Sequence, residues 1–182
     1  MRSRRGIAAS WLFLVAFGCS ATLSEPRVDS VSGLPQYSSE EAVHFDDAFA
    51  LEVFEAGRVD PAQDPNLLKR VRSADSVLAV RVATVTVLDR SAGCHLELRP
   101  VAPALSGRPI ADPIALSIPP ASSSYQLVAS TGFDLIGTTL ILFLRRYKEN
   151  GRPVFHWHAS LNTPELRAAV RIIVLQSSES RL

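Results

Sequence analysis

The sequence predicts an α+β fold, a five-stranded antiparallel β-barrel with N-terminal helices and a C-terminal helix. Three observations lead to this prediction. Apolar residues recur at spacings of three and four between residues 40 and 56, which is typical of a helix. Between residues 75 and 160, β-branched and alternating segments are separated by turn residues. A second helical pattern opens at residue 164, after a capping threonine.

Two helices are expected before the barrel. The first covers residues 40–56, where one face is apolar and Gly57 marks the end. The paired acids Glu40–Glu41 and Asp46–Asp47 are then expected on its solvated face. A second helix is expected over residues 65–72, because Asp64 suits the cap and a proline suits the first helical position.

Five segments within residues 75–160 have strand character. The phase of the first segment slips between Val82 and Val85, which predicts a bulge. Pro113 places the third segment at a sheet edge, and Asn150-Gly151 predicts a tight hairpin. Residues 119–131 are expected to be a Pro/Ser-rich connection. An immunoglobulin-like sandwich is the alternative, but it needs about seven strands. The five segments are 77–88, 95–101, 110–118, 138–145 and 154–159.

The C-terminal helix is expected over residues 164–175. Thr163 suits the cap, Pro164 the first helical position and Glu165 the first turn. Residues 176–182 are polar and are expected to form a loose tail. The globular domain is therefore expected to cover residues 40–175.

Composition excludes several functional classes. The chain has 182 residues, 47% of them apolar, with 19 basic and 18 acidic side chains. This balance argues against nucleic-acid binding, which requires a basic excess. The apolar content argues against disorder, and two cysteines are too few for a four-cysteine zinc module.

The N-terminus has the three parts of a secretory signal peptide over residues 1–18. A basic MRSRR segment precedes an apolar run at residues 7–17, which is too short to span a bilayer. Removing this segment leaves 16 basic and 18 acidic residues, a net charge of −2. Residues 19–39 are Ser-rich and are expected to be a flexible tether spanning about 20–25 Å.

The segment Ala16-Phe17-Gly18-Cys19 resembles the lipobox of bacterial lipoproteins. Gly18 and Cys19 fit that pattern, whereas the family prefers leucine and a small residue where Ala16 and Phe17 stand. The resemblance implies a mature chain that begins at Cys19 and carries acyl chains such as palmitate on that residue. Ser20, in place of aspartate, implies sorting to the outer membrane. The alternative is ordinary cleavage after Gly18 and free secretion into the periplasm or medium.

A second resemblance concerns the predicted barrel. Three segments are similar to strands and turns of secreted OB-like and netrin-like barrels: Asp75–Val82, Leu105–Gly107 and Gly137–Leu144. The resemblance implies an OB-like barrel within residues 75–160. The cysteine pair that opens animal netrin-like modules is missing, so no inhibitor activity is implied.

His156 and His158 are the best candidates for chemistry. On a strand, side chains two residues apart point to the same side, as two metal ligands would. A third ligand could come from His95, Cys94, His44 or an acid. The favoured interpretation is an outward polar face with Trp157 buried opposite, so no metal or cofactor is expected. Catalytic motifs such as Gly-x-Ser-x-Gly and Gly-rich phosphate loops are missing from the sequence.

The sequence therefore predicts a non-enzymatic, membrane-anchored lipoprotein of the cell envelope. Its small barrel would bind a protein or another envelope component through residues 119–131 and 149–152, by analogy with OB-like barrels. The alternatives are a metal-binding or enzymatic periplasmic module that uses His156 and His158, and a freely secreted protein. The basic cluster of Arg145, Arg146 and Lys148 is interpreted as a solvated hairpin rather than as a site for lipid headgroups or glycans.

Overall fold

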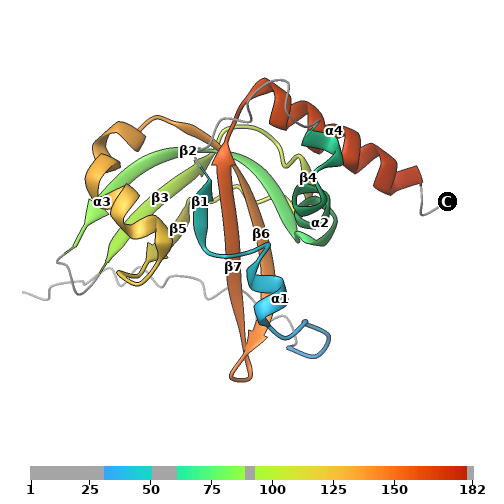
Figure 1. Cartoon of the computed structure of the whole chain (residues 1–182), viewed down its shortest axis with the longest axis horizontal. Helices are drawn as coiled ribbons and strands as arrows, with labels where there is room; N and C mark the ends of the chain where they lie inside the picture. The colour runs from blue at the N-terminus through green and yellow to red at the C-terminus, as the bar shows by residue number, and fades with distance from the viewer. Residues whose placement is uncertain (1–30, 51–60, 89–92, 180–182) are drawn as a thin grey trace, which may run out of the picture. The chain divides into compact units, whose positions relative to one another are not determined.

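One curled, mixed β-sheet organises the chain. The structure is a computed structural model and describes residues 31–50, 61–88 and 93–179, which fall within a single compact unit. In this described part, seven strands form a half-barrel and four α-helices accompany it (Figure 1). The fold is therefore α+β, as predicted.

The strand order places chain neighbours apart. Every pairing is antiparallel except that of β1 with β7, which is parallel, and the short strand β4 pairs with β2 beside the main order. In spatial order the strands are β1 (Ala48–Ala50), β7 (Arg152–Leu161), β6 (Thr139–Glu149), β2 (Ser76–Val87), β3 (Cys94–Pro100) and β5 (Ile114–Ile118), with β4 at Ser106–Gly107.

The predicted five-stranded antiparallel barrel is present only in part: the sheet is curled into a half-barrel, but it contains a parallel pair and does not clearly close. Closure requires the two edge strands to pair with each other, and among the described residues β1 and β5 do not pair. Helix α3 (Ser123–Leu135) contacts β1, β2 and β3 instead, and it packs against one face of the sheet (Figure 1). Phe49 of β1 and Leu116 of β5 reach the same hydrophobic cluster as this helix. We call the face that α3 covers the inner face of the sheet.

The middle of the sheet is buried on both faces, over the first half of β2 and most of β6. Leu78 and Val80 of β2 contribute to the cluster on the inner face, whereas Val77 and Ala79 contribute to a second cluster on the outer face. Helices α2 (Pro65–Ser73) and α4 (Pro164–Glu179) cover the outer face, and the short 3-10 helix η1 (Pro61–Gln63) contacts both. A strand covered on both sides needs apolar residues at successive positions, which explains the continuous apolar runs of β2 and β6.

The prediction of one helix over residues 40–56 is wrong. Helix α1 covers only Ser39–Ala42, and the chain then turns through Asp47, whose φ is +51°, into β1. Residues 51–56 lie outside the described residues. Phe45 belongs to the outer cluster and Phe49 to the inner one, so the two side chains lie on opposite faces of the sheet. Pairing of β1 with β7 overrides the helical spacing of the segment.

The prediction of an irregular connection at residues 119–131 is also wrong, because this segment contains most of helix α3. Ser122 caps this helix by accepting a hydrogen bond from the Ser124 amide at 3.2 Å. Tyr125, Val128 and Leu135 are buried on one side of the helix. Serine, threonine and glycine have weak helix propensity, so burial of this apolar side stabilises a helix that the local sequence does not favour.

Both ends of the predicted domain also need correction. Residues 35–38 do not belong to a free tether: the amide of Lys148 donates to the Pro35 carbonyl at 2.8 Å, and Gln36 forms a bridge with Lys148. At the other end, α4 continues to Glu179, so residues 176–179 are helical rather than a loose tail. The predicted signal peptide at residues 1–18, Cys19 and residues 20–30 of the predicted tether lie outside the described residues.

Several local predictions are confirmed. Asp64 caps α2 through the Asn66 amide at 2.9 Å, and Thr163 caps α4 through the Leu166 amide at 3.2 Å. The register of β2 with β3 shifts between Val82 and Thr84, which is the predicted bulge. The third strand, now β5, lies at the sheet edge. Asn150 and Gly151 both have positive φ, as the tight β6–β7 hairpin requires.

Candidate functional site: a histidine–carboxylate network

Strand β7 places His156 and His158 on the same side, as their spacing predicts, but that side is not the solvated face expected. His156 is 8% exposed and His158 is 3% exposed. The outer face of the sheet is itself covered, so a side chain that points away from the inner cluster still becomes buried. Trp157 is buried in the inner cluster, on the opposite face, as expected.

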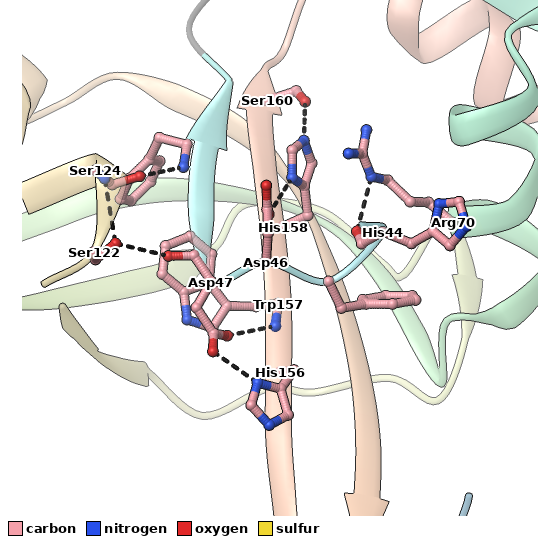
Figure 2. A network of polar contacts seen from close by, with 12 residues as sticks. His44, Asp46, Asp47, Arg70, Ser122, Ser124, His156, Trp157, His158 and Ser160 are labelled. Carbon is pink, nitrogen blue, oxygen red and sulfur yellow. Dashed lines mark hydrogen bonds and ion pairs between the residues drawn. The ribbon is translucent and has the colours of Figure 1, made fainter. Parts of the chain in front are cut away.

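His158 lies between an acid and a hydroxyl (Figure 2). Its Nδ1 is 2.8 Å from Oδ1 of Asp46, and its Nε2 is 3.3 Å from Oγ of Ser160. Asp46 precedes β1 and Ser160 follows on β7, so parallel pairing of these two strands brings the three groups together. Both ring nitrogens of His158 therefore have a partner within the protein.

His156 lies between two acids and beneath an aromatic ring. Its Nδ1 is 2.7 Å from Oδ2 of Asp47, and its Nε2 is 3.2 Å from Oε1 of Glu149. The ring of Tyr37 stacks on the imidazole with centroids 3.6 Å apart and an interplanar angle of 4°. The ring of Tyr147 meets it edge-on at 5.6 Å. His156 therefore joins the segment before α1 to the β6–β7 hairpin.

Asp47 organises the junction between β1 and β7. Its Oδ1 accepts a hydrogen bond from the Trp157 amide at 2.9 Å, and its own amide donates to the Trp157 carbonyl at 2.9 Å. From the other side, Ser122 Oγ donates to the Asp47 carbonyl at 3.5 Å, and Ser124 Oγ accepts from the Phe49 amide at 2.8 Å (Figure 2). The prediction that Asp46 and Asp47 lie on a helix is therefore wrong; Asp46 remains exposed, as expected, whereas Asp47 is partly buried.

The network shifts the acid–base behaviour of its members. Burial lowers the pKa of His156, but the hydrogen bonds and negative charges of Asp47 and Glu149 outweigh it, and the net pKa is raised. Burial acts to raise the pKa of Asp46, but the hydrogen bond and charge of His158 outweigh it, and the net pKa is lowered. Burial, followed by the charge of Asp47, raises the pKa of Tyr37 to about 12.

A second buried network centres on Glu41 of α1. Its Oε2 accepts hydrogen bonds from Tyr147 Oη and Arg145 Nη1, both at 2.7 Å, and its Oε1 is 3.9 Å from Lys69 Nζ. Arg145 is thus paired and largely buried, and Arg146 lies 3.5 Å from Asp75. The prediction of a solvated cluster therefore fails for these two arginines and holds for Lys148, which is exposed.

Of the candidate third ligands, the structure brings acids to the two histidines, as hydrogen-bond partners, but not Cys94 or His95. His44 instead accepts a hydrogen bond from Arg70 Nε at its carbonyl, at 2.8 Å. Cys94 and His95 are on β3, which β2 and β6 separate from β7. Cys94 is buried, and His95 instead contacts Ser117 at 3.0 Å. Within residues 31–50, 61–88 and 93–179, no group of three or more histidine, cysteine or acidic side chains has the geometry of a metal site.

The network consists of hydrogen bonds within the protein that hold strands β1 and β7 together. Each imidazole nitrogen of His156 and His158 already faces an oxygen of the protein. Sequence reasoning did not find the partners, because Asp46 and Asp47 lie about 110 residues away in the chain. No local signal connects an Asp-Asp pair to a distant His-x-His segment.

None of the described helices is both long and apolar enough to cross a bilayer.

Comparison with other proteins does not assign this chain to a family. Comparison with protein-family models, with curated proteins and with solved structures finds no match for this chain.

Proposed function

We propose that this chain is a non-enzymatic, lipid-anchored protein of the bacterial cell envelope, sorted to the outer membrane, whose α+β domain binds a protein or another envelope component. Two features support the proposal. The segment that ends in Gly18-Cys19 resembles a lipobox. The most reactive groups of the described domain, His156 and His158, are turned inward and hydrogen-bonded.

The inward-facing histidines are the observation that carries the non-enzymatic part. A metal ligand or a general base needs a nitrogen that can reach a metal ion or a substrate. In this protein both nitrogens of each ring face protein oxygens, and both side chains are buried. The arrangement suits a structural role, in which the network fixes β1 and the segment before it against β7.

Metabolic labelling with palmitate tests the anchor. We expect label on the wild-type protein, no label after Cys19→Ser, and transfer of that variant from the membrane fraction to the soluble fraction. Cys94→Ser is the matched control and keeps its label, because Cys94 is buried in the domain. Label that survives Cys19→Ser would contradict lipidation at Cys19, and an unlabelled wild type cleaved after Gly18 would support the secreted alternative.

Crosslinking in whole cells followed by purification of the anchored protein tests the binding role. We expect one reproducible envelope partner that crosslinks to the folded domain. Crosslinks that are no more frequent than those of an unrelated lipoprotein at equal abundance would contradict this part of the proposal.

A hydrolase is the second candidate, because the order Asp46–His158–Ser160 is that of an acid–base–nucleophile chain. Ser160 is only 6% exposed, which argues against access of a substrate. We expect no labelling of the native protein by a fluorophosphonate probe, and no metal in stoichiometric amount. Labelling that Ser160→Ala abolishes would favour the hydrolase, and metal that His156→Ala with His158→Ala removes would favour a metal module.

A further inference from the structure

A basic and aromatic surface lies at the free end of the β6–β7 hairpin. Lys148, Arg152 and Pro153 are exposed, and the side chain of Phe155 is 54% exposed. The register places Lys148, Pro153 and Phe155 on one side of the hairpin and Arg152 on the other, across from Glu149. We call these four residues at the end of the hairpin the hairpin surface. Arg146 lies directly across from Phe155 on β6, and its guanidinium is 5.9 Å from the centre of the Phe155 ring. Neither Lys148 nor Arg152 forms an ion pair with any residue in the described ranges.

The hairpin surface projects beyond the neighbouring strands. Strand β2 pairs with β6 only as far as Leu144, and β1 pairs with β7 only from His158 onward. Beyond these points β6 and β7 pair with each other as a hairpin (Figure 1). Gln36 forms a bridge with Lys148 there. The turn is therefore free to approach a surface without obstruction by the rest of the sheet.

The chain enters the domain beside this surface. Pro35 and Gln36 contact the backbone of Lys148. Cys19 and Pro35 are 16 residues apart, and covalent geometry limits that distance to about 55 Å. An acyl chain on Cys19 would thus connect the bilayer to the hairpin end of β7, whereas α4 follows the opposite end of that strand.

The acids near the hairpin surface are mostly engaged elsewhere. Glu149 contacts His156, and Glu41 contacts Arg145 and Tyr147. Glu40 of α1 remains exposed. The mature chain has a net charge of −2, so attraction to an anionic surface has to come from a local concentration of cations.

We propose that the hairpin surface is the membrane-facing side of the domain, where Lys148 and Arg152 contact anionic lipid headgroups and Phe155 enters the interface. The inference rests on the proposed lipid anchor and adds an orientation to it. A cation near an anionic leaflet and an aromatic ring at the headgroup level both favour such docking. The anchor supplies a high local concentration, so a modest affinity of the surface is enough to orient the domain.

Lipid quenching of a fluorophore tests the orientation. The mature lipidated chain carries Pro153→Cys, labelled with an environment-sensitive dye, in vesicles of phosphatidylcholine with or without phosphatidylglycerol. Spin-labelled lipid quenches a dye that reaches the headgroups. Leu175→Cys on α4, 66% exposed, is the matched control position. We expect quenching at residue 153 in the anionic vesicles, weaker quenching in phosphatidylcholine alone, and little at residue 175.

Neutralising variants test the chemistry. Lys148→Gln with Arg152→Gln should weaken docking roughly 30-fold, the equivalent of about 2 kcal/mol for two cations. Arg81→Gln with Arg171→Gln removes the same charge from exposed positions on β2 and α4 and should leave docking unchanged. Phe155→Ser should weaken docking without removing its salt dependence.

Three outcomes would overturn the inference. The first is equal quenching at residues 153 and 175. The second is an equal loss of docking in the two charge-neutralising double variants. The third is dye-to-dye contact between copies of the protein in place of contact with lipid. The same measurements on a mature chain with Cys19→Ser at high lipid concentration separate the two proposals. Salt-dependent quenching of the Cys19→Ser chain supports the hairpin surface, even where palmitate labelling has contradicted the anchor. Absence of quenching in both the lipidated chain and the Cys19→Ser chain refutes the hairpin surface and leaves the anchor untouched.

Discussion

Replacing Asp47 should destabilise the protein more than any other single change in the histidine–carboxylate network. Its carboxylate accepts two hydrogen bonds, from the Trp157 amide at 2.9 Å and from His156 at 2.7 Å, and its backbone has a φ of +51°. Asparagine and aspartate tolerate this left-handed conformation better than alanine. Asp47→Ala therefore removes both bonds and adds backbone strain, whereas Asp47→Asn keeps the conformation and an acceptor for Trp157.

The structure allows an estimate of both effects. A hydrogen bond to a charged group contributes about 1.5–3 kcal/mol. The Asp47 side chain is 31% exposed, so water replaces part of the loss. We expect Asp47→Ala to lower the free energy of unfolding by about 3 kcal/mol and Asp47→Asn by about 1 kcal/mol. For a chain of this size these values correspond to decreases in Tm of about 6–12 °C and 2–4 °C.

Urea denaturation followed by tryptophan fluorescence measures the difference. Trp157 is 4% exposed, and Trp11 belongs to the segment expected to be removed, so the emission of the mature chain reports the β7 environment. Asp112→Asn, at an exposed position, is the matched control and should change the midpoint little. Losses of less than about 0.5 kcal/mol for both Asp47 variants would refute the reasoning. An equal loss for the two would refute the separate roles of charge and backbone.

Three further predictions concern pH and packing. Because the native pKa of His156 is raised above its usual 6.5, the contribution of His156 to stability should be complete below about pH 6.5 and should be lost as pH rises through the native pKa. Urea midpoints at several pH values above about 5 check this, and His156→Gln should flatten the curve in that range. Gly107→Ala should lower Tm by several degrees, because φ is +76° and the new Cβ would meet the Asp75 carbonyl, whereas Gly151→Ala, with φ of +77° and open space, should have a smaller effect. Tyr37→Ala should speed hydrogen exchange at the Lys148 amide without changing that of Leu142, because the stacked ring holds Pro35 in place; equal protection in the variant would contradict this.

The local features of the fold were predictable because their causes are local. A cap and a proline start α2 and α4, Asn150-Gly151 closes the β6–β7 hairpin, and a phase slip marks the bulge in β2. Each depends on backbone geometry within a few residues, which the amino-acid sequence by itself determines. The apolar segments at residues 77–88 and 138–145 similarly identify strands β2 and β6, because only burial explains them.

The remainder depends on contacts between distant residues. Phe45 and Phe49 have helical spacing, yet the tertiary structure places them on opposite faces of the sheet because Asp47 pairs with Trp157, 110 residues away. The sequence of helix α3 has weak helix propensity, and the helix forms because its apolar side is buried against the inner face of the sheet. The same long-range pairing of β1 with β7 decided the roles of His156 and His158. Their spacing determined that they share a side, and only the tertiary structure turned that side inward, where two aspartates replace water as their partners.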